Sequence, residues 1–267
     1  MPLAVCATPI GNLEDVTLRV LAALRKADVV LCEDTRHTRG LLERHRIDAR
    51  LLSYHEHNEA ARTAELLPRL ERGERVALVS DAGMPGVSDP GARLVRAALD
   101  AGIEVTVLPG PSAVETALVS SGLIGERYEF VGFLPRSAKA LGVLWESLAD
   151  RRWPVVAFES PQRLPSTLRS LAAFDPARPV AVCRELTKRF EEIARGTAAA
   201  LAERFAEPPK GEITLVVGAG EGRVVDDAAG LAAVAELVDA GVPRKQAAEL
   251  VARLTGASRN ALYRGSL

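Results

Sequence analysis

The sequence predicts an α/β protein built from two domains, with a small helical unit after them. Short runs of β-branched residues alternate with longer segments of 3.6-residue periodicity, a pattern typical of parallel strands joined by crossover helices. A chain of 267 residues also favours two domains, at about 150 residues each. We therefore expect an N-terminal α/β domain at 1–122, a C-terminal α/β domain at 123–222 and a small helical tail at 226–267.

The first domain is predicted from four apolar runs and the helical patterns around them. The runs are short enough to be strands and begin with "LAVCAT". A last helical pattern, "PSAVETALVSSGL", closes the domain. The expected strands are 3–8, 28–33, 75–80 and 104–110, and the expected helices are 17–26, 37–46, 58–72, 89–101 and 111–123.

The second domain repeats the alternation. Its expected strands are "YEFVGFLP", "PVVAFES", "PVAVCREL" and "EITLVVGAG", with helical segments between them. At the junctions, Asp89 and Ser160 each precede a proline and are expected to cap helices. Ser112 and Glu115 have the spacing of a capping box. Because such turns lie at the carboxyl ends of parallel strands, we expect ligands to bind there.

The tail has an acidic half and a basic half. Residues 226–241 carry four carboxylates and no basic residue, whereas 242–267 carry five basic residues against Glu249. The run "PRKQAAELVARL", followed by "TGA" and "SRNALYRGSL", has the spacing of a small helix-turn-helix.

The composition excludes several classes of protein. A hydrophobic content of 48% and a charged content of 26% are ordinary for a globular protein, and no apolar run reaches the roughly 18 residues of a membrane span. The N-terminus lacks the basic start of a signal peptide and the three cysteines form no CxxC pair, so we expect a cytoplasmic protein. A net charge of −1 means that any nucleic-acid surface must be local.

The stretch "VSDAGMPGVSDPG", residues 79–91, combines three glycines and two prolines with two aspartates and no basic residue. A phosphate-binding loop needs a Lys or Arg beside its backbone amides, so this loop favours another ligand. Two carboxylates suit a molecule with positive charge and hydroxyl groups, such as S-adenosylmethionine. Two alternatives stay open: Asp81 and Asp89 bind a divalent metal, or the glycines only make turns and Asp89 only caps a helix.

Three further segments carry side chains suited to chemistry. In "YHEHNE", residues 54–59, His55 and His57 alternate as zinc ligands do, but no Cys or HExxH partner follows. A loop near the substrate, or a structural role, is favoured there, and no metal site is assigned. "CEDTRHTRGLLERH" and "RELTKRFEE" both leave a strand with carboxylates next to cations. Such groups can orient or deprotonate a hydroxyl, or they form surface ion pairs.

Eight segments in order resemble the ribosomal RNA small subunit methyltransferase I family of the tetrapyrrole-methylase superfamily. The resemblance runs from residue 5 to about residue 220 and is more specific than any single motif. The segments are "ATPIGNLEDVTLR", "EDTRHTRGLL", "SYHEHNE", "LVSDAGMPGVSDPG", "LPGPSA", "GFLPR", "FESPQRL" and "CRELTKRFEEIARGT".

The resemblance implies a two-domain fold that binds S-adenosylmethionine between the domains and acts as a homodimer. It implies methylation of a cytidine ribose 2′-hydroxyl in the decoding region of 16S ribosomal RNA, within the small ribosomal subunit. Second-domain contacts to the cofactor would come from "GFLP", "AFES" and "GEIT". The matching first-domain positions are Pro9, Asp81, Ala82, Gly83, Pro85, Ser88, Pro111, Ser112 and Ala113.

The chain departs from the family pattern at Met84 and Gly86, where a Thr and a bulkier aliphatic residue are expected. A hydroxyl lost at position 84 would remove one side-chain contact to the cofactor, whereas backbone contacts would survive.

Two sets of residues are candidates for the catalytic role: Glu185 with Lys188, or Asp34 with Arg36 and His37. The sequence does not choose between them. RNA would bind to basic residues of the helix predicted after the second strand and of the tail. The expected RNA-binding residues are Arg36, Arg39, Arg44, Arg244, Lys245 and Arg259.

Two other functions compete with RNA methylation. Within the superfamily, the alternative is a tetrapyrrole C-methylase or a diphthine-type protein methylase. From a different class, a ligand-sensing core with a helix-turn-helix would be a DNA-binding regulator, although the second helix of the tail is short for base readout.

Overall fold

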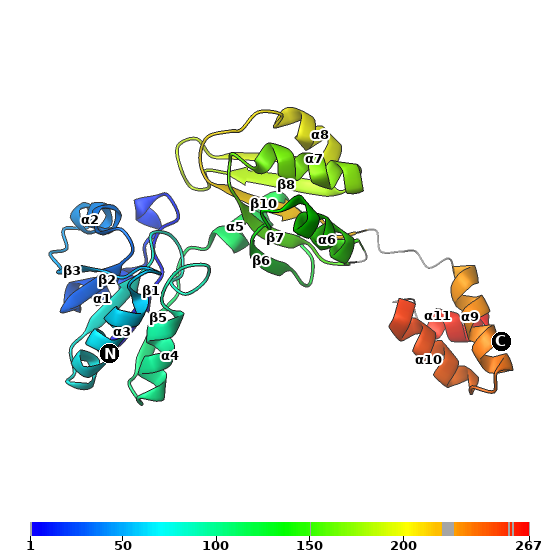
Figure 1. The fold of residues 1–267 in the computed structure, drawn as a ribbon, viewed down its shortest axis with the longest axis horizontal. Helices are drawn as coiled ribbons and strands as arrows, with labels where there is room; N and C mark the ends of the chain where they lie inside the picture. Colours follow the sequence, from blue (N-terminus) through cyan, green and yellow to red (C-terminus); the bar gives the residue numbers. More distant parts are fainter. Residues whose placement is uncertain (1, 150, 221–226, 256, 258, 267) are drawn as a thin grey trace.

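The computed structural model describes residues 2–149, 151–220, 227–255, 257 and 259–266. Two five-stranded sheets, each with its own helices, form the first 220 residues, and a helical unit follows them (Figure 1). This architecture confirms the α/β prediction and the helical tail.

The first sheet is entirely parallel, in the order β3-β2-β4-β1-β5. All residues of β1, β2 and β4 are buried, because helices cover both faces of the sheet. The strand β3 was not expected; it is three residues long and only half-buried. The strands are β1 Leu3–Cys6, β2 Val29–Cys32, β3 Leu51–Ser53, β4 Val76–Val79 and β5 Val105–Leu108.

Two apolar cores hold the helices against this sheet. On one face, Leu24 of α1 and Leu42 of α2 pack over alternate strand residues. On the other face, Leu66 of α3 and Leu94 of α4 pack over the intervening ones. A short 3-10 helix, η1 (Leu13–Asp15), precedes α1. The helices are α1 Leu18–Lys26, α2 Thr35–Arg44, α3 Glu59–Glu71 and α4 Ala92–Asp100.

The second sheet is mixed, in the order β6-β7-β10-β8-β9. Only β6 and β7 run parallel, whereas β10 is antiparallel to both of its neighbours and β9 forms a hairpin with β8. The strand β9 was not expected. The elements are β6 Glu129–Phe133, α6 Ala138–Leu148, β7 Val155–Glu159, α7 Leu164–Phe174, β8 Pro179–Arg184, β9 Glu192–Thr197, α8 Ala198–Arg204 and β10 Ile213–Val217.

The helix α5 (Ala113–Ser121) joins the two halves of the molecule. We expected it to close the first domain, yet its buried face packs on the second sheet, where Val114 and Ala117 contact the cluster around Val156 and Val216. Ile10, from the loop after β1, joins the same cluster. The seam between the halves is therefore an apolar core, and the domain limits at 122 and 222 stay a prediction.

Two of the three expected helix caps are wrong. The helix α4 starts at Ala92 after Gly91, so Asp89 does not cap it. The helix α7 starts at Leu164 after Arg163, so Ser160 does not cap it. Ser112 does occupy the N-cap of α5, but its hydroxyl bonds the Glu115 carboxylate instead of a backbone N–H.

The C-terminal unit consists of α9 (Asp227–Asp239), α10 (Arg244–Thr255) and α11 (Arg259–Gly265) among the described residues. Val234, Ala247, Val251 and Leu262 form its small core. No helix in the described part of the chain is long and apolar enough to cross a membrane.

Candidate active site

The loops that follow β1, β4 and β5 meet at the carboxyl edge of the first sheet. Thr8 and Gly83 exchange two backbone hydrogen bonds of 2.8 and 3.0 Å, and the Thr8 hydroxyl donates to the Ser80 carbonyl at 3.0 Å. Gly83 has a φ of +75°, and a Cβ there would lie 3.8 Å from the Pro111 carbonyl oxygen. The hydrogen bonds and the close approach bring together the loops that carry the expected cofactor residues Pro9, Asp81, Ala82, Gly83, Pro85, Pro111, Ser112 and Ala113.

A carboxylate from the preceding helix holds the far end of the 79–91 loop. Glu59 of α3 accepts hydrogen bonds from the Gly91 backbone and the Tyr54 hydroxyl, both at 3.1 Å. Gly91 has a φ of +139°, and a Cβ there would lie 2.9 Å from a Leu78 methyl group, so only glycine fits. The "YHEHNE" segment therefore positions the 79–91 loop.

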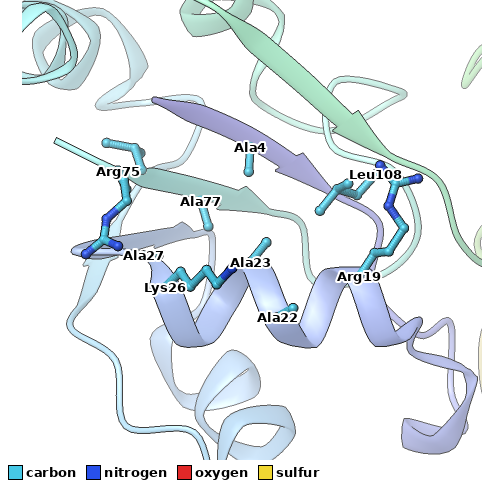
Figure 2. Close-up of a pocket in the computed structure, with 10 residues that line it drawn as sticks. Ala4, Arg19, Ala22, Ala23, Lys26, Ala27, Arg75, Ala77 and Leu108 are labelled. Carbon is cyan, nitrogen blue, oxygen red and sulfur yellow. The ribbon is translucent and has the colours of Figure 1, made fainter. Parts of the chain in front are cut away.

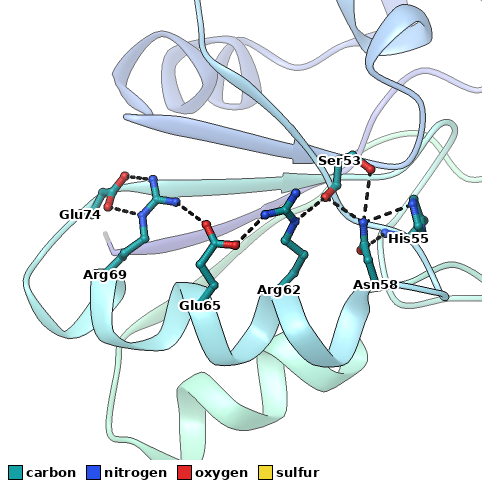
Figure 3. A network of polar contacts seen from close by, with 7 residues as sticks. All are labelled: Ser53, His55, Asn58, Arg62, Glu65, Arg69 and Glu74. Atoms are coloured by element: carbon teal, nitrogen blue, oxygen red, sulfur yellow. Dashed lines mark hydrogen bonds and ion pairs between the residues drawn. The ribbon is translucent and has the colours of Figure 1, made fainter.

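His55 and His57 lie in a turn rather than on an extended segment. The His55 backbone donates to the Asn58 amide oxygen at 2.9 Å, and the Asn58 amide donates to the Ser53 carbonyl at 3.2 Å. Polar contacts continue from there along α3 to Glu74 (Figure 3). In the described residues, no group of three His, Cys, Asp or Glu side chains is placed to hold a metal ion.

Three carboxylates gather at this edge: Glu33, Asp81 and Asp89. Burial, together with the charges of Asp89 and Asp81, raises the pKa of Glu33 to about 7. Burial and the Asp81 charge raise the pKa of Asp89 to about 6. Glu33 Oε1 is buried with no hydrogen-bond partner, and none of the three forms an ion pair within the described chain. The sequence predicted both aspartates as ligand groups; it marked the segment that contains Glu33 but gave Glu33 no place beside them, although its position directly after β2 was the available signal.

The 79–91 loop also faces the second half of the molecule. Ser88 has a φ of +65°, and a Cβ built on Gly132 of β6 would lie 3.9 Å from its hydroxyl. Met84 is half-buried and packs against the core beneath the loop. Gly86 has a φ of +83°, which disfavours the bulkier residue of the family pattern.

The first candidate catalytic set, Asp34 with Arg36 and His37, begins the helix α2. Asp34 caps the helix by accepting from the Arg36 backbone at 2.8 Å, and it also accepts two bonds from the Arg36 guanidinium. Those bonds from Arg36 lower the pKa of Asp34 to about 2. The carboxylate is therefore engaged by its own helix. His37 and the expected RNA-binding Arg39 are exposed on α2.

The second candidate pair, Glu185 and Lys188, lies in the turn between β8 and β9. The Lys188 ammonium donates to Glu185 Oε1 at 3.0 Å and to Glu212 at 2.8 Å. Glu185 Oε1 also accepts from the Glu212 backbone at 3.0 Å. Glu185 and Thr187 have φ values of +53° and +64°, an uncommon conformation that often marks functional turns.

The Glu185–Lys188 pair stays charged at neutral pH. Burial alone would lower the pKa of Lys188, but its hydrogen bonds to Glu212 and Glu185 outweigh burial and raise it. The Glu212 backbone N–H, followed by the Lys188 ammonium, lowers the pKa of Glu185. Lys188 is therefore a donor of hydrogen bonds and not a base.

This pair borders a groove between the two halves. The Asn12 backbone donates to the Thr187 hydroxyl at 3.0 Å, and a Cβ on Gly11 would lie 2.5 Å from the Lys188 side chain. Arg44, one of the expected RNA-binding residues, reaches the groove and pairs with Glu14 at 2.7 Å. The open groove has a volume of about 560 Å³ and is lined by Gly11, Asn12, Leu13, Glu14, Arg44, Thr187, Lys188 and Arg189.

A second hollow lies between α1 and the first sheet and contains none of the expected site residues (Figure 2). Small side chains such as Ala4, Ala23 and Ala77 leave it open, and Arg19 and Lys26 lie on its rim. In the C-terminal unit, Lys245 and Arg259 are exposed, whereas Arg244 is half-buried and donates to the Ser266 carbonyl.

The chain matches the family of Tetrapyrrole (Corrin/Porphyrin) Methylases over residues 2–202 and the RsmI C-terminal HTH domain over residues 224–265. It is 45% identical to the ribosomal RNA small subunit methyltransferase I of Mesorhizobium japonicum, over 97% of this chain and 88% of the relative. The protein of that name from Thermotoga maritima is 46% identical, over 82% of this chain and 99% of the relative. This chain belongs to the ribosomal RNA small subunit methyltransferase I family.

Solved structures show the same fold at lower identity. A uroporphyrin-III-C-methyltransferase from Thermus thermophilus aligns with a TM-score of 0.59 and 23% identity, over 81% of this chain and 93% of the other. A diphthine synthase aligns with a TM-score of 0.62 and 18% identity, over 81% of this chain and 89% of the other. The two-domain fold of the family is thus confirmed, and with it the helix-turn-helix at the C-terminus.

The chain is a methyltransferase that uses S-adenosylmethionine, and the carboxyl edge of the first sheet fits that cofactor. Three carboxylates without a cationic partner, one with a buried free oxygen, suit a ligand that carries positive charge. The backbone of the glycine turns around Gly83 leaves room for close approach. These residues would hold the cofactor beside the groove that Lys188 borders.

Proposed function

We propose that this protein methylates the ribose 2′-hydroxyl of a cytidine in the decoding region of 16S ribosomal RNA. The observation that carries the proposal is the pairing of an acidic cofactor loop with a cation-lined groove across the domain seam. The names of the relatives from Mesorhizobium japonicum and Thermotoga maritima supply the class of substrate, ribosomal RNA of the small subunit.

The residues of the site have two tasks in this reaction: some bind the cofactor, and others align the attacking oxygen. S-adenosylmethionine, when bound, supplies a methyl group open to in-line attack. Glu33, Asp81 and Asp89 hold its charge, and the protein mainly has to align the attacking oxygen, which alone can contribute several kcal/mol.

At the groove, the Lys188 ammonium stabilises negative charge on the acceptor oxygen. Glu185 Oε1 is occupied by Lys188 and the Glu212 backbone, which leaves Oε2 to accept the hydroxyl proton. General-base assistance of this kind contributes about 10²–10⁴-fold.

The proposal also covers the RNA-binding surface, the oligomeric state and the place of the reaction. The RNA lies across Arg36, Arg39 and Arg44 and reaches Lys245 and Arg259 of the C-terminal unit, whose exposed cations neutralise phosphates. The enzyme acts in the cytoplasm as a homodimer, on RNA within the small ribosomal subunit.

The test is transfer of tritiated methyl from S-adenosylmethionine to unmodified 30S subunits and, separately, to naked 16S RNA. A 2′-O-methyl-sensitive primer-extension stop maps the product. We expect a stop at one cytidine of the decoding region with the subunit as substrate. No incorporation into either RNA, with cofactor binding intact by calorimetry, would contradict the proposal and favour a tetrapyrrole or protein substrate. A footprint on duplex DNA without methyl transfer would favour a DNA-binding regulator.

A further inference from the structure

The turn that carries Glu185 and Lys188 also presents an aromatic ring to solvent. Residues 185–191 connect β8 to β9, whose register pairs Arg184 with Glu192. Leu186 of this turn is buried in the core at the domain seam, with 6% of its surface exposed. Phe190, four residues later, is 65% exposed. Phe190 thus offers an aromatic face to solvent directly after Arg189, which lines the groove.

The turn is held rigidly enough to position that ring. The Lys188 backbone donates to the Glu185 carbonyl at 3.0 Å, and the Glu191 backbone donates to the Lys188 carbonyl at 3.1 Å. The Thr187 backbone donates to the Glu191 carboxylate at 2.6 Å. Two consecutive turns thus fix the backbone at Phe190 relative to the backbone at Lys188.

Arg189 lies between the ring and the groove. Its guanidinium carbon is 5.5 Å from the centroid of the Phe190 ring, within the range of a cation–π contact. Arg189 also lines the interdomain groove, and it forms no ion pair with a carboxylate of the described residues. A free cation beside an exposed ring combines the two features that bind single-stranded nucleic acid, a phosphate contact and a stacking face.

We propose that Phe190 stacks on one unpaired base of the RNA substrate while Arg189 binds the adjoining phosphate. This inference rests on the proposed function. Stacking would fix the nucleotide beside the Glu185–Lys188 pair, so that its ribose hydroxyl enters the groove in one orientation. A duplex offers no free base face, so the turn selects unpaired RNA.

The test compares Phe190→Leu, which keeps apolar volume but removes the ring, with Phe190→Trp, which keeps a ring. Phe174→Leu is the matched control, because Phe174 is an exposed aromatic residue at the end of α7, away from the groove. The probes are a fluorescein-labelled single-stranded RNA of the 16S decoding region and a duplex RNA of equal length. Binding is measured by anisotropy, and methyl transfer gives KM and kcat.

Stacking contributes about 1–3 kcal/mol per base, so we expect Phe190→Leu to weaken single-strand binding and raise KM by about tenfold. Phe190→Trp should stay within about threefold of the wild type, and Phe174→Leu and all duplex affinities should be unchanged. Arg189→Gln should lower the slope of log affinity against log salt by about 0.7.

An unchanged single-strand affinity in Phe190→Leu would overturn the inference while leaving the proposed function intact. Equal losses for duplex and single strand, or a change in the molecular mass of the protein in solution, would also overturn it, the latter by placing a second copy of the chain on Phe190. If the wild type binds single strands through Phe190 but methylates no ribosomal RNA, the proposed function fails and the stacking role stands.

Discussion

Two clusters of carboxylates face the seam between the halves, and they differ in how their charge is balanced. Glu33 and Asp89 lie beside Asp81 with no cation, and the pKa values of Glu33 and Asp89 are raised to about 7 and about 6. Glu185 and Glu212 surround Lys188, and the pKa of Glu185 is lowered. The first cluster is incomplete without a positive ligand, whereas the second already contains its counter-ion. This difference supports the proposal that the first cluster binds the cofactor and that the second acts on the acceptor oxygen.

The largest effect should come from Lys188→Met in the second cluster. Removing the ammonium leaves two carboxylates facing each other and no positive charge at the acceptor oxygen, so kcat should fall about 100-fold. The affinity for S-adenosylmethionine, measured by calorimetry, should not change. Unchanged turnover would remove Glu185 and Lys188 from the mechanism.

The complementary variant in the first cluster is Asp89→Asn. Loss of one negative charge should weaken S-adenosylmethionine binding about tenfold, which is 1.4 kcal/mol. S-adenosylhomocysteine, which lacks the positive sulfur, should lose less than about threefold. Equal losses for both ligands in calorimetry would show that Asp89 recognises some feature other than the charge.

Deleting residues 226–267 removes the C-terminal cations and leaves both carboxylate clusters in place. The tail offers exposed basic side chains such as Lys245 and Arg259, so RNA affinity should fall about tenfold, with a shallower salt dependence. Cofactor affinity should be the same with and without the tail. If the deletion leaves the RNA affinity unchanged, the tail is not part of the RNA-binding surface.

The two clusters should also differ in their response to pH. Between pH 8 and pH 5.5, Glu33 and Asp89 take up protons and lose the negative charge that attracts the cofactor. The affinity for S-adenosylmethionine should therefore fall about fivefold over this window, while that for S-adenosylhomocysteine stays level. A flat profile for S-adenosylmethionine would argue against the acidic cluster as its site.

The smallest effect concerns stability. Glu33 has a pKa of about 7 in the folded protein against an ordinary value of 4.5, so between these values the folded state holds a proton that the unfolded state releases. Below pH 4.5 Glu33 is protonated in both states and does not change the free energy of unfolding. Above pH 7 it is ionised in both states, and its burial lowers the free energy of unfolding by the full amount. Glu33→Gln should stabilise the protein by about 1 kcal/mol at pH 8, after solvent screening, and by little at pH 4.5, as measured by urea unfolding.

Local pattern predicted most of the fold. The apolar runs of β1, β2 and β4 are fully buried, so their composition alone marks them as strands. The strand β3 was not predicted because it has only three residues and all of them are half-buried. The strand β9, "EIARGT", is largely polar and owes its structure to its pairing with β8. The mixed direction of the second sheet is likewise set by pairings distant in sequence.

The candidate site was predictable where one segment carries several of its residues. The 79–91 loop supplied Asp81 and Asp89 together, and "RELTKRFEE" supplied Glu185 with Lys188. Glu33 and Glu59 lie in segments that the sequence singled out, but their place beside this loop was not predicted because each reaches it from another element through the fold. The error at Asp89 has the same cause: Glu59 bonds the Gly91 backbone at the start of α4, and this frees Asp89 from capping.

The central position of β10 in the second sheet has a consequence for synthesis of the chain. The helix α5 leaves the ribosome about a hundred residues before β10, which is the last strand to be made in the described part of the chain. Until Ile213–Val217 emerges, β7 and β8 have no common neighbour, and the apolar face of α5 lacks the part of its cover that Val216 supplies. The seam between the halves therefore closes late, which leaves its apolar residues open to misassembly until the last strand is made.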